Sequence, residues 1–66
     1  MPGPLWTYRF TDAENGEIET AGLADDTAAE ARGRDLSKSG NVVVRVERHS
    51  AHVDGWEYVT ECDERE

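Results

Sequence analysis

Residues 25–40, DDTAAEARGRDLSKSG, decide the fold, because they have the pattern of one helix flanked on both sides by extended segments. Thr27 and Glu30 have the spacing of a capping box, in which each side chain satisfies a backbone N–H at the start of a helix. Asp25 and Asp26 precede them and complement the positive end of the helix dipole. The sequence therefore predicts a helix that begins at this acidic cluster.

The predicted helix has a narrow apolar stripe that predicts close packing. Ala29, Gly33 and Leu36 recur at helical spacing. A glycine in a helix costs about 1 kcal/mol relative to alanine, so we expect Gly33 to serve close contact between the helix and a sheet. Gly40 is expected to take the left-handed conformation that ends the helix.

A β-hairpin is predicted on the N-terminal side of the helix. Residues 5–11, LWTYRFT, alternate between apolar and polar side chains, and residues 17–21, EIETA, form the returning strand after the turn signal Asn15-Gly16. A two-residue turn would turn Ile18 away from the aromatic face. A three-residue loop over 14–16 with a left-handed Gly16 would place Ile18 on the same face as Phe10. We favour the second register, because burial of Ile18 is worth about 2 kcal/mol.

A second hairpin is predicted on the C-terminal side, between residues 41–47 and 56–61. The dipeptide Asp54-Gly55 is one candidate turn, but it would separate the valines from the aromatic side chains of the last strand. A loop over residues 49–53 is favoured, because it pairs aromatic with β-branched residues and acids with arginines. This register sets Val46 opposite Trp56, Val44 opposite Tyr58, Arg45 opposite Glu57 and Arg48 opposite Asp54.

The predicted fold class is α+β with the order ββαββ, in which one helix packs on one face of a small, mostly antiparallel sheet. The chain forms a single domain over 1–66, with an ordered core of about 5–62 and frayed ends at 1–4 and 63–66. The predicted core comprises Trp6, Tyr8, Phe10, Ile18, Leu23, Ala29, Leu36, Val42, Val44, Val46, Trp56 and Tyr58. The uncovered face, which is the expected interaction surface, comprises Leu5, Thr7, Arg9, Val43, Arg45, Glu57 and Val59.

The net charge of the chain indicates which classes of partner it could bind. Asp and Glu number 15 against 7 Lys and Arg, a net charge of −8. This balance disfavours nucleic acid and anionic membranes, whose binding depends on basic residues. No apolar run could span a bilayer, so we expect a cytoplasmic protein. The acidity fits either halophilic adaptation or the coding bias of a GC-rich genome, and both explanations stay open.

Two alternative functions follow from the charged surface. Arg32, Arg34 and Lys38 form a basic cluster on the helix, which would make the nucleic-acid contacts of a small regulator. The carboxylates could instead mimic nucleic acid and inhibit a basic protein.

Metal binding and catalysis are not expected. His49, His52 and Cys62 are weak zinc ligand candidates with Asp54 nearby, but Cys62 lies more than about 20 Å along the strand from the histidine loop. Ser50 beside His49 lacks the cleft that nucleophilic catalysis needs. We therefore expect a non-enzymatic protein without a cofactor. It would act by protein–protein association, as a homodimer and with a protein partner that the sequence does not identify.

Overall fold

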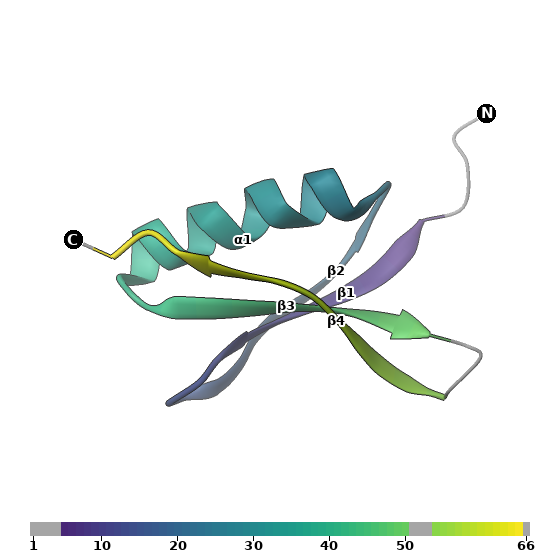
Figure 1. Cartoon of the computed structure of the whole chain (residues 1–66), viewed down its shortest axis with the longest axis horizontal. Coiled ribbons are helices and arrows are strands. Elements are labelled where there is room, and N and C mark those ends of the chain that lie inside the picture. The colour runs from purple at the N-terminus through teal and green to yellow at the C-terminus, as the bar shows by residue number, and fades with distance from the viewer. Residues whose placement is uncertain (1–4, 51–53, 66) are drawn as a thin grey trace.

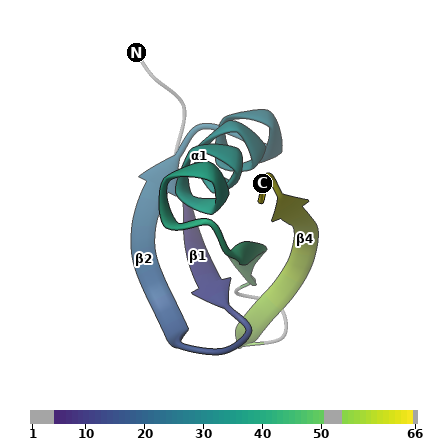
Figure 2. The same ribbon diagram turned by 90° about the vertical axis from the view of Figure 1, so that its left-hand side faces the viewer.

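The computed structural model describes residues 5–50 and 54–65 and has the predicted ββαββ order. Its elements are β1 (Trp6–Asp12), β2 (Gly16–Leu23), α1 (Asp26–Gly40), β3 (Val43–Ser50) and β4 (Gly55–Asp63). The strands form one antiparallel sheet in the order β2-β1-β3-β4, and α1 covers one face of it, against β3 and β4 (Figures 1 and 2). The predicted fraying of Met1–Pro4 lies outside the described residues. The described helix is not long and apolar enough to cross a membrane.

The helix α1 begins at the predicted acidic cluster, whereas its C-terminal cap lies one residue beyond the predicted position. Asp25 is the N-cap, and its carboxylate accepts a hydrogen bond from the backbone N–H of Ala28 at 2.8 Å. Because the helix begins at Asp26, Thr27 already lies within its first turn and cannot cap it. At the other end Asn41, not Gly40, takes the left-handed conformation, with φ 53° and ψ 47°. Asparagine tolerates this region better than most residues.

The β1–β2 turn has the expected left-handed glycine but a different register. Gly16 has φ 88° and lies opposite Asp12. The backbone N–H of Glu14 donates to the carboxylate of Asp12 at 2.9 Å, which lowers the pKa of Asp12. A bulge then sets Glu19 opposite Phe10 and leaves Ile18 without a pairing residue in β1. Ile18 is 42% exposed, so its predicted burial on the face of Phe10 is wrong.

The register of the β3–β4 hairpin also differs from the prediction. Ser50 pairs with Gly55, so His49 belongs to β3 and not to a loop. The observed partners are Arg45 with Glu61, Val46 with Thr60, Arg48 with Glu57 and His49 with Trp56. The turn lies between Ser50 and Gly55, and a bulge shifts the register by one further residue between Val46 and Glu47, so the predicted pairing of valines with aromatic residues is wrong.

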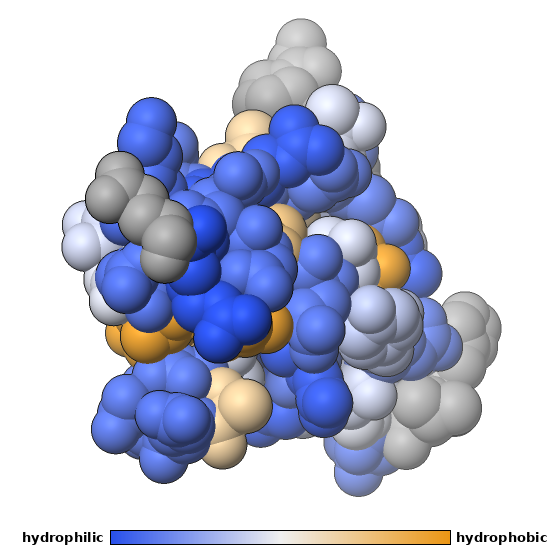
Figure 3. All heavy atoms as spheres, turned by 60° about the vertical axis from the view of Figure 1, so that its left-hand side comes forward, coloured by the Kyte–Doolittle hydropathy of each residue, from blue (hydrophilic) through white to orange (hydrophobic). Residues whose placement is uncertain are grey.

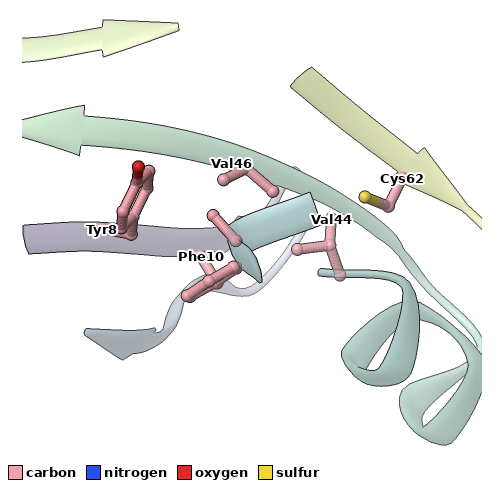
Figure 4. Packing of buried hydrophobic residues seen from close by; sticks show 6 residues of the cluster. Tyr8, Phe10, Val44, Val46 and Cys62 are labelled. Atoms are coloured by element: carbon pink, nitrogen blue, oxygen red, sulfur yellow. The ribbon is translucent and has the colours of Figure 1, made fainter. Parts of the chain in front are cut away.

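The core lies between α1 and the sheet, and close approach of the helix shapes it. Its buried members are Tyr8, Phe10, Ala29, Val44, Val46 and Cys62 (Figure 4). A Cβ added to Gly33 would lie 2.8 Å from both the Sγ of Cys62 and a methyl carbon of Val46, so the predicted close contact is confirmed. The bulge in β4 turns the side chains of Trp56 and Tyr58 to the other face.

Ser37 joins the end of α1 to the residue before β3 and to the residue after β4. Its side chain is fully buried, and its hydroxyl donates to the carbonyl of Val42 at 2.5 Å. The same hydroxyl accepts from the backbone N–H of Glu64 at 2.7 Å. This contact holds the chain beyond β4, where the sequence predicted fraying from Asp63 onward.

Candidate interaction surface on the open face of the sheet

The face of the sheet opposite α1 is the candidate functional surface, and we call it the open face. Alternation and strand register assign to it Thr7, Arg9, Thr11, Val43, Arg45, Glu47, His49, Trp56, Tyr58 and Glu61. Of the predicted interaction residues, Thr7, Arg9, Val43 and Arg45 lie on this face. Leu5 precedes β1 and is 63% exposed, next to Gly22.

Two predicted members of this surface lie on the helix side instead. Glu57 pairs with Arg48 at 3.3 Å, and Arg48 lies opposite the buried Tyr8. Val59 packs against the hydrophobic core. The bulge in β4 is the physical reason, because one extra residue exchanges the two faces for the first half of the strand.

The same bulge brings two aromatic side chains to the open face. The guanidinium of Arg9 donates to Glu47 at 3.2 and 3.0 Å and lies 4.5 Å from the ring centre of Trp56. The His49 ring meets Trp56 edge-on, with a centroid distance of 5.4 Å. Tyr58 lies opposite Glu47 and is 65% exposed. We call these five residues the open-face cluster.

The open-face cluster has the composition of an interface centre. Trp, Tyr and Arg are the residues most enriched at binding hot spots. The side chains of Arg9 and Glu47 are mostly shielded from solvent, and each fixes the other before any partner binds. Little side-chain entropy would therefore be lost on association.

A shallow hollow adjoins the cluster at the β1–β2 end of the open face. It encloses about 320 Å³ and is lined by Thr11, Asp12, Ala13, Gly16, Val43, Arg45 and Glu61. Across the residues that the structure describes, Arg45 is the one arginine that makes no hydrogen bond or ion pair, although Glu61 lies opposite it. The Thr11 hydroxyl is buried and lacks a hydrogen-bond partner among the same residues.

The basic cluster predicted on the helix is largely neutralised by carboxylates. Arg32 donates two hydrogen bonds to Glu19, at 2.8 and 2.6 Å, which raise the pKa of Arg32 and lower that of Glu19. Arg34 pairs with Glu30 on the same helix. Lys38 lies in the last turn of α1. Little positive charge is left there for a phosphate backbone.

The zinc candidates lie on different faces of the sheet. His49 is exposed on the open face, whereas Cys62 is buried beneath α1, where burial raises the pKa of its thiol. Asp54 is exposed in the β3–β4 turn, and His52 lies outside the described residues. Over residues 5–50 and 54–65, no three His, Cys, Asp or Glu side chains come together as a metal site. Ser50 is buried at the end of β3, while the neighbouring His49 is exposed.

Sequence reasoning missed His49, Trp56 and Tyr58 as open-face residues. No local sequence signal marks the bulge in β4 that turns Trp56 and Tyr58 to this face. Figure 3 shows a largely hydrophilic surface with small separate hydrophobic patches, seen from the side where α1 ends.

Comparison with known protein families, with curated proteins and with solved structures finds no significant match to this chain.

Proposed function

We propose that the protein acts by protein–protein association, and that its open face binds a second copy of the same chain. The observation that carries the proposal is the open-face cluster, in which Arg9 lies over Trp56 and Tyr58 lies opposite Glu47, on the face that α1 leaves bare. Catalysis and a cofactor form no part of the proposed function.

The charge of the open face supports a second copy as the occupant. Arg9 and Arg45 balance Glu47 and Glu61 in the middle of this face, whereas the whole chain has a net charge of −8. Two copies of an acidic protein repel one another, and the repulsion is smallest where the local charge is near zero. This face therefore permits self-association better than the acidic remainder of the surface.

The edges of the sheet favour a face-to-face contact over strand pairing. The two edge strands, β2 and β4, each contain a bulge, and both strands are rich in glutamate. Bulges and charged residues at an edge oppose the addition of another strand. Association through the open face needs no free strand edge.

The size of the face sets the expected strength of the dimer. Four strands about 4.8 Å apart and about eight residues long cover roughly 500 Å². Two such faces in contact would bury about 1,000 Å², the lower bound for a specific interface. We therefore expect a weak dimer that forms at high micromolar protein concentration.

The experiment that tests the proposal is sedimentation velocity from low micromolar to millimolar protein. The natural protein should shift from monomer to dimer, and Tyr58→Ser should weaken the dimer about tenfold, because an exposed aromatic anchor is lost. Ile18→Ser is the matched control, since it removes an exposed apolar side chain from the opposite edge strand. A natural protein that stays monomeric at millimolar concentration overturns the proposal, as does equal weakening by both variants.

Single-stranded nucleic acid is a second candidate occupant, because exposed aromatic residues beside arginines can stack on bases. The acidity of the chain argues against it, so titration with single-stranded oligothymidylate at low salt should leave tryptophan fluorescence unchanged. Quenching that molar salt reverses and that Tyr58→Ser abolishes would transfer the proposed function to nucleic-acid binding.

The mimicry of nucleic acid by the acidic surface is less well supported. A mimic needs an array of free carboxylates, whereas Glu19, Glu30, Glu47, Glu57 and Asp63 each pair with an arginine of the same chain. These five of the fifteen Asp and Glu residues are therefore engaged within the molecule.

A further inference from the structure

We infer that the two copies pack about a two-fold axis that runs between β3 and β4, parallel to the strands, so that Arg45 of each copy pairs with Glu61 of the other. This inference rests on the self-association proposed above and names its geometry. The starting point is Arg45, which faces the hollow without an ion pair, whereas every other described arginine has one.

The strand register determines which residues such an axis would bring together. Arg45 lies directly opposite Glu61 across β3 and β4. Rotation by half a turn about a line between these strands places β4 of the second copy over β3 of the first. Only β3 and β4 of each copy then meet, so the contact buries about half of the area that full overlap of the two faces would bury, which is the size of a weak, transient interface. Glu61 of the second copy then lies over Arg45, and the symmetry repeats the contact.

The other cross-strand pairs on this face are complementary under the same rotation. Tyr58 of one copy would face Glu47 of the other, so that a phenol hydroxyl meets a carboxylate. Trp56 would face His49 of the second copy, and these rings already meet edge-on within one chain. All three pairs therefore bring together groups that attract.

If the two-fold axis is moved sideways onto either strand, the contacts between the two copies become less favourable. An axis along β3 would place Arg45 over Arg45 of the second copy, and an axis along β4 would place Glu61 over Glu61. Like charges brought into contact at an interface oppose association strongly. The hollow beside Thr11 and Val43 adds space into which the paired side chains can extend.

Charge reversal tests this geometry. Arg45→Glu and Glu61→Arg should each weaken the homodimer at least about tenfold, because symmetry creates two like-charge contacts. The double variant should restore the natural affinity to within about threefold. Arg32→Glu is the matched control, because it breaks an ion pair on the helix side and should leave the dimer unchanged.

A mixture of the two single variants gives the decisive measurement. Under the proposed axis, Arg45→Glu and Glu61→Arg chains form a heterodimer in which both inter-copy pairs attract. Native mass spectrometry should therefore find the heterodimer about tenfold above the statistical expectation. If Arg45 and Glu61 pair only within one chain, the variants show no preference for each other.

The outcomes separate this inference from the proposed function. A natural protein that dimerises while neither single variant changes its affinity overturns the two-fold arrangement and leaves self-association standing. Restored stability in the double variant without restored dimerisation also overturns it. A natural protein that never dimerises overturns both the two-fold arrangement and the proposed self-association. Urea denaturation of each variant confirms that it is folded at the concentrations used.

Discussion

The two faces of this sheet are built by different means. On the covered face, Gly33 brings the helix backbone into contact with Cys62 and Val46, and burial of apolar side chains stabilises the fold. On the open face, Arg9 lies across Trp56 and pairs with Glu47. The difference teaches that strand register, including the bulge in β4, decides which aromatic side chains become core.

The largest expected difference between the faces is in stability. Phe10→Ala on the covered face should destabilise the protein by about 4 kcal/mol, because Phe10 is fully buried and its loss leaves a cavity. Domains of this size have only about 3–5 kcal/mol of stability, so the variant should be largely unfolded by circular dichroism. Tyr58→Ala on the open face should cost less than about 0.5 kcal/mol at monomer concentrations. Equal losses of stability in the two variants would contradict the proposed difference between the covered face and the open face.

A smaller effect is expected where the helix meets the sheet. Gly33→Ala should lower the free energy of unfolding by about 1–3 kcal/mol, because the added methyl group collides with packed core atoms. This loss exceeds the gain in helix propensity of up to about 1 kcal/mol. Gly40→Ala in the same helix is the control, since its Cβ would meet Val42 at an ordinary 3.4 Å. If urea denaturation finds Gly33→Ala more stable than the natural protein, the space between the helix and the sheet can accept a methyl group, and the prediction is wrong.

The smallest effect concerns a polar group on the covered face. The Tyr8 hydroxyl donates to Asp26 at 2.6 Å, and burial together with Asp26 raises the pKa of Tyr8 to about 12. Tyr8→Phe should therefore cost about 1 kcal/mol at neutral pH. Because the fold favours the protonated phenol, its stabilisation is complete below pH 10, the ordinary pKa, and is lost as the pH rises toward about 12.

The measurement for Tyr8→Phe is urea denaturation at neutral pH and across the alkaline range. It is best made in a Cys62→Ala background, because burial also raises the pKa of the Cys62 thiol and adds its own alkaline loss. The natural Tyr8 should show a decline in stability that Tyr8→Phe lacks. An identical decline in both would assign it to other groups.

The local parts of the fold were predictable from the sequence, and the pairing of distant strands was not. Alternation placed Tyr8 and Phe10 on the buried face, and the helical stripe placed Ala29 and Gly33 against the sheet. Two bulges then changed the pairing in β2 and β4. A bulge depends on partners far away in the chain, and a shift of one residue exchanges the faces of a strand.

The candidate site was predictable only in part for the same reason. Thr7, Arg9, Val43 and Arg45 belong to strands whose alternation is regular, and the prediction placed them on the open face. Trp56 and Tyr58 were assigned to the core because burial of aromatic residues usually stabilises a fold. The bulge in β4 instead turns both side chains to the open face.

The buried hydroxyl of Ser37 has a consequence for how the protein opens. It joins the end of α1 to Val42 and Glu64, so β4 cannot separate from the sheet at this end without breaking a contact of the helix. The amide hydrogen of Glu64, although near the end of the chain, should then exchange with solvent at the slow rate of the last helical turn. Helix and final strand would open as one cooperative unit.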